Sequence, residues 1–504
     1  MSFGRKIVKA SIGVSLIMVL AHILSFVKEA LIANYFGVSY IVDAYTIAIQ
    51  VPVLLFSFVS VAIQSIVVPV YSDIFYNEGK DKAREYINHL MTILLLFTVF
   101  LVVIGECFAG ELVYLSAPGF DDVTHQLSTH LLRITFPTII MAIVGQVLVA
   151  VLNVHKRFVL PSFAVFFMNV SMIIAIVLLH EELGITSACI GQLIGDFLRA
   201  LFLIIIARKF YHYSFAFNLH DVSVKKTLKL SVPVFFSISI AEVNAIVNRI
   251  VGSLLIVGSI SAITYANKIN TVLMQLFVSA IATVVYPLYA ESSAKGNMSQ
   301  LNTRINLTLS VYALFVVPLM FGVFVFKKEL IEVAFARGVF DKSAVELTQN
   351  LLGLYAIGML FMAIRTPITN VYYSLKNTKT PAINASIGAI INIVLNILLA
   401  HILGVQGIAI ATSITAVYIT TSLTITLMHK YKEIRWNYFF NNLSKIVLAS
   451  IVMFIVLIFA KTFLQFKSFY VLVVGALIGL LVYVVNLLIL KVMIVKKLLQ
   501  LLKK

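Results

Sequence analysis

The feature that most constrains this chain is a series of about fourteen long apolar segments. A helix needs about 20 mostly apolar residues to cross the hydrocarbon of a bilayer. Inside hydrocarbon every backbone N–H and C=O group must be bonded within the protein, so we expect helices and not open strands. The sequence therefore predicts an all-α integral membrane protein. The expected spans are residues 8–34, 40–71, 88–115, 125–153, 159–180, 184–208, 229–254, 258–290, 303–327, 345–374, 380–402, 405–428, 443–464 and 468–491.

The composition excludes a soluble protein. Of the 504 residues, 61% are hydrophobic and 12% are charged, whereas soluble domains carry about 25% charged residues. The two cysteines, Cys107 and Cys189, lie in apolar segments and indicate neither a disulfide framework nor a metal cluster. The sequence contains no Gly-rich phosphate loop and no His/Cys spacing typical of metal ligands. We therefore expect no cofactor, no metal and no catalytic centre.

The net charge of +17 predicts an orientation in the membrane and not a nucleic-acid partner. With the N-terminus inside, most of the 38 Lys and Arg residues fall in loops on the cytoplasmic side, as the positive-inside rule requires. The first apolar segment has no small-residue cleavage motif, so we expect it to be retained as a helix. Both termini are then cytoplasmic. The terminal basic residues are Arg5, Lys6, Lys9, Lys496, Lys497, Lys503 and Lys504, and those assigned to outer loops are Lys327, Lys328, Arg337, Lys342, Lys461 and Lys467.

Charged residues inside the expected spans are the candidate functional residues. Charge at bilayer depth is costly, and it persists where it faces a protein interior or a water-filled cavity. The cations outnumber the acids, and such a cavity suits an anionic cargo. The exception is Asp196 with Arg199, which we interpret as a local i,i+3 pair. The cations are Lys28, Arg133, Arg199, Arg249, Lys268 and Arg365, and the clearest acids are Glu29, Asp43, Asp196 and Glu242.

The stretch from His22 to Asp43 gathers several of these residues near the N-terminus. We interpret it as one wall of a polar cavity. Adjacent helix positions do not face each other, so Lys28 and Glu29 are expected to point in different directions. The alternative is that these two charges neutralise each other near a helix end.

A weak internal repeat predicts the domain organisation. Pro69-Val-Tyr71 follows span two and Pro287-Leu-Tyr289 follows span eight, while prolines open spans five and eleven. The offset of six spans implies two six-helix lobes around a central cavity, as in many transporters. The expected domains are residues 1–215, 216–430 and a C-terminal helix pair at 431–504. Broken or bent helices are common where a transporter lines a cavity, and the alternative is kinking that neighbouring helices tolerate. The prolines within the expected spans are Pro52, Pro69, Pro137, Pro161, Pro233, Pro287, Pro367 and Pro381.

Short motifs in a fixed order along the whole chain carry a resemblance. They include Phe26-Val-Lys28-Glu29, Ala117-Pro118-Gly119-Phe120, Arg133 to Pro137, Tyr265-Ala266-Asn267-Lys268 and Phe335 to Asp341. Together these motifs resemble the MurJ/MviN family of lipid II flippases, within the multidrug/oligosaccharidyl-lipid/polysaccharide exporter superfamily. The resemblance implies a fourteen-helix transporter of the bacterial inner membrane.

In this family the cargo is an undecaprenyl-pyrophosphate-linked peptidoglycan precursor, moved from the inner to the outer leaflet by alternating access. The resemblance implies that this lipid-linked saccharide and membrane lipid are the partners here, together with proteins of cell-wall synthesis. It also implies a groove for the lipid tail, formed by spans thirteen and fourteen. The implied substrate-binding residues are Lys28, Glu29, Asp43 and Lys268, to which we add His22, Arg249 and Arg365 from the charge argument.

The sequence departs from the family pattern at several of these positions. His22 stands where the family has an arginine, Lys28 and Lys268 replace arginines, and arginines of some members fall near Phe56 and Ser57. Because arginine binds phosphate bidentately and lysine does not, another lipid-linked oligosaccharide stays an alternative cargo. Positions matching a sodium site of some members are Asn248, Asn392, Asn396 and Thr412. Since Asn248 and Asn396 replace carboxylates and a hard cation prefers charged oxygen ligands, we expect no sodium site.

Two other readings remain open from the sequence. A multidrug antiporter of the same superfamily would need an acidic cavity for cationic drugs and has twelve spans, so the positive charge disfavours it. A membrane scaffold or an enzyme of envelope synthesis would need the intramembrane charges to be structural or to form a catalytic acid pair.

Overall fold

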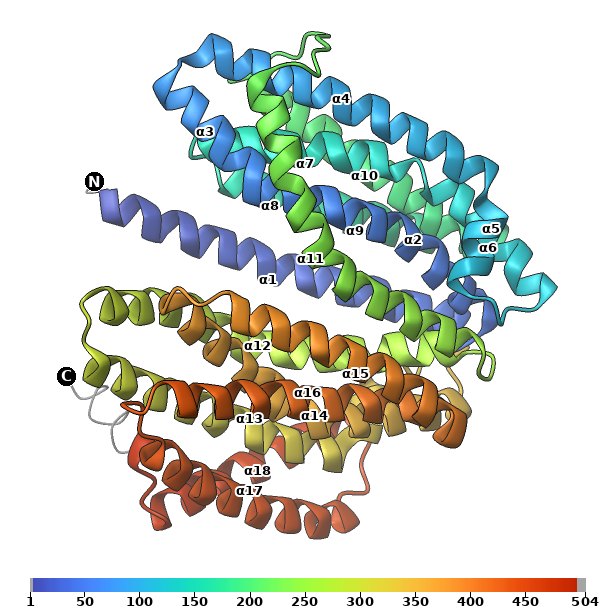
Figure 1. Ribbon diagram of the computed structural model, residues 1–504. Coiled ribbons are helices and arrows are strands. Elements are labelled where there is room, and N and C mark those ends of the chain that lie inside the picture. The colour runs from blue at the N-terminus through green and yellow to red at the C-terminus, as the bar shows by residue number, and fades with distance from the viewer. Residues whose placement is uncertain (1–2, 496–504) are drawn as a thin grey trace. The chain divides into compact units, whose positions relative to one another are not determined.

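The computed structural model describes the backbone of residues 3–495 and, except at residues 3–12, 15–16, 236–238, 240–241, 276–280 and 282–284, their side chains. All regular elements in this range are helices (Figure 1), which confirms the all-α class. The predicted orientation used basic side chains that lie outside the described ones, namely those of Arg5, Lys6, Lys9, Lys496, Lys497, Lys503 and Lys504.

Each expected span corresponds to one helix or to a few consecutive helices. The first six spans contain α1 (Phe3–Phe36), α2 (Tyr40–Ala62), η1 (Ile63–Val67), α3 (Val68–Asn77), α4 (Lys80–Cys107), α5 (Ala109–Ser116), α6 (Asp122–Thr135), α7 (Thr138–Val154), α8 (Val159–Phe163), α9 (Val165–Leu183) and α10 (Thr186–Ala207). The other eight are α11 (Val222–Ser253), α12 (Ser259–Ala294), α13 (Met298–Phe335), α14 (Lys342–Ser374), α15 (Lys379–Leu403), α16 (Val405–Lys430), α17 (Asn437–Phe463) and α18 (Ser468–Ile489).

Twelve helical segments among the described residues are long and apolar enough to cross a membrane. The two remaining expected spans fall in α11 and α12, which are 32 and 36 residues long and each contain side chains that are not among the described ones. A multi-pass membrane protein of about fourteen spans is therefore confirmed, with the exact number approximate.

Proline accounts for several breaks within spans, because it lacks the N–H that the helix ladder needs. Pro137 separates α6 from α7, and Pro161 lies in the short helix α8. In span two a π-helical turn, η1, precedes Pro69 in the first turn of α3. A break is thus present at Pro137, and span two has a local irregularity before Pro69 while its helix continues. Pro52, Pro233, Pro287 and Pro367 lie inside helices that continue past them.

Two pairs of loops repeat the same backbone conformation in the two halves of the chain. Lys156 and Lys376 follow α7 and α14 and have φ values of 60° and 58°, a left-handed conformation that is uncommon for residues other than glycine. Gly184 and Gly404 join α9 to α10 and α15 to α16 with φ values of 55° and 58°. The sequence repeat therefore has a counterpart in local structure.

The chain divides into two compact units, Met1–Ser261 and Ala262–Lys504. Helix α11 packs against α2, α4 and α5 within the first unit. In the second unit α13 packs against α14, α17 and α18, and their buried side chains form one apolar core. The division into two six-helix lobes and a C-terminal pair stays a prediction.

Close packing of α9 on α10 depends on glycines of α10. A Cβ atom added at Gly195 would lie 2.6 Å from the Cα of Met168, and one at Gly191 would lie 2.8 Å from the Cα of Met172. Small residues spaced by four allow membrane helices to approach closely and gain dispersion energy. On the same helix Asp196 and Arg199 form the expected local ion pair at 3.8 Å, and Asp196 is 5% exposed.

Candidate functional site

Lys28 and Glu29 of α1 form an ion pair. Lys28 Nζ lies 3.1 Å from Glu29 Oε1, and the two side chains are 14% and 15% exposed. The expectation that neighbouring positions point apart is wrong here, because both side chains are long enough to bend together although their Cβ atoms diverge. The ion pair offsets part of the cost of placing either charge at depth. The pair keeps a cation and a carboxylate together on α1, which packs against α8 and α9.

His22 lies nearly two turns before this pair on α1. Its Nδ1 atom is 2.6 Å from the carbonyl oxygen of Met18, and the residue is exposed. One ring nitrogen is therefore bound to its own helix, and the ring is presented on the surface of α1. Its place on the same helix as Lys28 agrees with the expected polar wall, while its role with a substrate stays a prediction.

Asp43, near the start of α2, is 4% exposed and accepts hydrogen bonds from the backbone. Its carboxylate oxygens accept from the N–H of Gly258 and from the N–H of Ser261, each at 2.7 Å. Gly258 has a φ of +87°, a conformation that glycine adopts without strain. These donors belong to the start of α12, so Asp43 satisfies a helix N-terminus whose N–H groups have no partner within the helix. This contact explains why a carboxylate is buried here without requiring a bound ligand.

Arg249 and Glu242 lie two turns apart on α11. Both are partly buried, and the negative charge of Glu242 attracts Arg249. Ser57 of α2 donates to Glu242 Oε1 at 2.8 Å. Ser57 is one of the positions near which some relatives carry arginine, and here it supplies a neutral donor to an acid. The structure therefore shows that Glu242, one of the acids identified within the spans, is bonded to Ser57 of α2.

The second unit carries the other two candidate cations. Lys268 is partly buried on α12, a turn after Tyr265, whose buried ring packs against Phe335 and Phe340. Arg365 is exposed on α14. A charge exposed on a membrane-spanning helix needs water or a polar ligand beside it. Arg365 therefore stays a candidate for contact with an anionic substrate, and Lys268 stays one on the family pattern alone.

Three of the four positions that match the sodium site of some relatives make hydrogen bonds within the second unit. In the second unit Asn396 Nδ2 donates to Asn392 Oδ1 at 2.9 Å, and Asn392 Nδ2 donates to Thr415 Oγ1 at 3.1 Å. Thr412 Oγ1 donates to the carbonyl of Ile408 at 2.9 Å. Asn248 lies on α11 in the first unit. No group of three or more His, Cys, Asp or Glu side chains that could hold a metal ion is found among the described residues.

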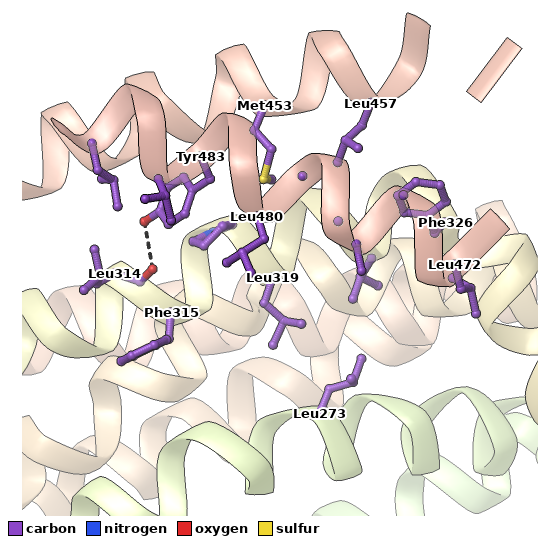
Figure 2. Close-up of a pocket in the computed structure, with 18 of the residues that line it drawn as sticks. Leu273, Leu314, Phe315, Leu319, Phe326, Met453, Leu457, Leu472, Leu480 and Tyr483 are labelled. Carbon is purple, nitrogen blue, oxygen red and sulfur yellow. Dashed lines mark hydrogen bonds between the residues drawn. The ribbon is translucent and has the colours of Figure 1, made fainter. Parts of the chain in front are cut away.

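A groove of about 620 Å³ lies along α13, α17 and α18 in the second unit. Figure 2 shows Leu314 and Tyr483 at one end and Phe326 and Leu472 at the other, with Leu319 between them. Its lining is almost entirely apolar and includes small residues of α18 such as Gly475. A long apolar groove on a membrane-spanning unit suits a hydrocarbon chain, since neither the chain nor the wall has polar groups to satisfy.

Sequence reasoning missed the polar contacts beside this groove. Lys461, assigned to an outer loop, lies inside α17, where its Nζ is 2.8 Å from an oxygen of Glu329 on α13. Glu329 is 7% exposed. The signal that could have revealed the contact was an acid just beyond the end of span nine and a base near the same, outer end of span thirteen. The tyrosine hydroxyl of Tyr483, which donates to the carbonyl of Leu314 at 2.8 Å, left no signal of its own.

A family model and two curated relatives that match this chain all carry the same description. The family model described as "Lipid II flippase MurJ" matches residues 32–483. A protein named "Probable lipid II flippase MurJ" from Buchnera aphidicola subsp. Baizongia pistaciae is 29% identical over 383 residues, 74% of each chain. Its namesake from Thermotoga maritima is 26% identical over 478 residues, 95% of each chain.

Two solved structures resemble the fold of this chain. The structure "Lipid II flippase MurJ, inward closed conformation" has a TM-score of 0.82 at 27% identity, and the match covers 94% of this chain and 97% of that one. An inward-facing multidrug resistance MATE family transporter of the MOP superfamily has a TM-score of 0.70 at 11% identity, covering 84% and 98%. At that identity the second likeness is one of fold alone.

Proposed function

Since this chain belongs to the family described as lipid II flippase MurJ, we propose that it moves lipid II, a lipid-linked peptidoglycan precursor, from the inner to the outer leaflet. The observation that carries the proposal is the family match over residues 32–483, together with an apolar groove in the second unit. The protein is then a transporter of the bacterial inner membrane, with both termini in the cytoplasm.

The head group of such a cargo cannot cross hydrocarbon unaided. Its phosphates and sugar hydroxyls would lose water without a replacement partner, which is costly. Lys28 and Lys268 supply positive charge for the pyrophosphate during the transport cycle, and Arg249 and Arg365 add to the positive field. Glu29, paired with Lys28 at 3.1 Å, releases that lysine when the anion competes for it. His22 is a neutral or cationic contact on the same helix.

The tail of the cargo stays in an apolar environment throughout. The groove along α13, α17 and α18 has the lining that an isoprenoid needs. Holding the tail on the second unit keeps it out of water while the head group exchanges access from one leaflet to the other. An inside-negative potential favours outward movement of the anion by about 2.3 kcal/mol per charge per 100 mV.

A second cargo follows from one observation, the lysines at positions 28 and 268. A lysine holds phosphate as a point charge, whereas arginine forms a planar pair of hydrogen bonds. A lipid-linked oligosaccharide for capsule, exopolysaccharide or teichoic-type polymers presents the same pyrophosphate and isoprenoid, so the same residues fit it. The multidrug reading rests on fold likeness alone, at 11% identity.

Depletion of the protein in its bacterium tests the function. Without the flippase, its cargo accumulates on the inner leaflet, and lipid extraction followed by mass spectrometry identifies it. Accumulation of lipid II is the expected result, and resupply of the wild-type protein should reverse it. Accumulation of a different lipid-linked oligosaccharide would assign the alternative cargo. Unchanged levels of all such lipids would refute a flippase function.

A further inference from the structure

Two side chains of α17 and α18 donate hydrogen bonds to backbone carbonyls of α13, and they do so at the two ends of the groove. Tyr483 of α18 bonds the carbonyl of Leu314, and Lys461 of α17 bonds the carbonyl of Val325. Leu314, Phe326 and Tyr483 all line the groove. The wall formed by α13 is therefore attached to its neighbours at two fixed points.

The first attachment replaces a hydrogen bond that a proline removes from α13. Pro318 has no N–H, so the carbonyl of Leu314, four residues earlier, has no donor within α13. The hydroxyl of Tyr483 donates to that carbonyl at 2.8 Å, and the tyrosine is 6% exposed (Figure 2). Proline is tolerated in membrane helices where a neighbouring helix satisfies the freed group in this way. The bond joins α18 to α13 at one end of the groove.

The second attachment lies at a break in α13. Phe326 has φ −104° and ψ 20°, outside the helical range. Lys461 Nζ donates to the carbonyl of Val325 at 2.8 Å and lies 2.8 Å from Glu329 Oε1. A side chain that inserts into the ladder of helix bonds is a recognised cause of a kink. Lys461 therefore holds α13 in its broken conformation, and Glu329 holds Lys461.

The break determines where the Phe326 ring points. The ring is 5% exposed and lies against α18, so closely that a Cβ atom at Gly475 would be 2.3 Å from its Cζ. An unbroken helix would direct this side chain differently, because the backbone angles at position 326 set its exit from the helix. The end of the groove at Phe326 thus depends on Lys461, and the end at Leu314 depends on Tyr483.

We propose that Tyr483 and Lys461 are positioning residues that fix the two ends of the groove and thereby set its preference for a long isoprenoid tail. The proposal rests on the proposed function, because it assumes that the groove holds the tail of the cargo. Neither residue needs to touch the pyrophosphate. Loss of either bond lets the α13 wall move, and the groove then distinguishes long from short tails less well.

Two probes that share a pyrophosphate and differ in tail length test the idea. Undecaprenyl pyrophosphate and farnesyl pyrophosphate are titrated separately into the full-length protein in nanodiscs, and native mass spectrometry gives the dissociation constant of each. The quantity measured is the ratio of the two constants. Tyr483→Phe removes only the hydroxyl, Lys461→Met removes the charge at similar length, and Lys461→Arg retains a cationic donor.

Tyr372→Phe is the matched control. The Tyr372 hydroxyl also donates to a carbonyl, that of Leu423, at 2.8 Å, and the side chain is fully buried in the same unit. Tyr372 does not line the groove. A merely structural role of Tyr483 would make the two Tyr→Phe variants lose thermal stability alike and keep the same ratio.

We expect the preference for the long tail to fall about fivefold in Tyr483→Phe and in Lys461→Met, as the loss of one buried hydrogen bond implies. It should be retained in Lys461→Arg and Tyr372→Phe. An unchanged ratio in Tyr483→Phe, or an equal fall in Tyr372→Phe, would overturn the inference while leaving the proposed function intact. Failure of the wild type to bind either probe would instead overturn the proposed function and this inference with it. Should Lys461→Met not fold, Tyr483→Phe carries the test alone.

Discussion

Replacing Asp43 tests whether its carboxylate stabilises the fold or binds the substrate. The side chain is 4% exposed and accepts hydrogen bonds from the N–H groups of Gly258 and Ser261, both at 2.7 Å. Hydrogen bonds to a charged group contribute about 1.5–3 kcal/mol each. Asp43→Ala leaves two buried donors without their acceptor, so we expect it to cost about 3–6 kcal/mol of stability. That is a large part of the total stability of a typical protein.

Asp43→Asn refines the test. The amide retains one acceptor oxygen and loses the charge, so we expect a loss of roughly half that size. The assay is the temperature at which the detergent-solubilised protein loses its monodisperse size-exclusion peak. The order expected is wild type, then Asp43→Asn, then Asp43→Ala. Asp341→Ala is the control, because Asp341 caps α14 with one backbone bond, to Ala344 at 2.8 Å, at an exposed position and should cost only about 1 kcal/mol.

One result would refute this reasoning. If Asp43→Ala melts with the wild-type protein and yet no longer transports the lipid-linked precursor, the carboxylate acts on the substrate and not on the start of α12. If the variant melts early and the fraction that stays folded still transports, the structural assignment stands.

Three further predictions concern transport and membrane topology. Lys28→Ala and Lys268→Ala should each abolish flipping of lipid II in vesicles, while Lys→Arg at either position keeps it at least in part because the charge remains; normal flipping in both alanine variants would remove these lysines from the site. Transport should continue when sodium is replaced by potassium at constant membrane potential, because asparagines occupy the positions of the carboxylates in the family's sodium site; arrest would contradict this. A cysteine introduced at Asp122 should react with an impermeant reagent from outside, and one at Lys225 only from inside, as the positive-inside rule requires; labelling of both from one side would refute the topology.

Much of the fold was predictable because its signals are local. A span of about 20 apolar residues must satisfy its own backbone groups, so helix position follows from the apolar runs alone. The same locality explains the success with Asp196 and Arg199, whose i,i+3 spacing on α10 places them on one face. It also explains the break at Pro137 between α6 and α7, since proline removes a bond within its own helix.

The sequence by itself thus determined the class, the spans, the charged residues at depth and the family pattern. Only the tertiary structure decided what those charges contact. Lys28 and Glu29 meet because flexible side chains override the direction of their Cβ atoms. Asp43 binds backbone more than 200 residues away in sequence, and Lys461 reaches a carbonyl of α13 across more than 130 residues. Such partners follow from how helices pack, and no pattern within one helix encodes which distant backbone group will need a donor or an acceptor.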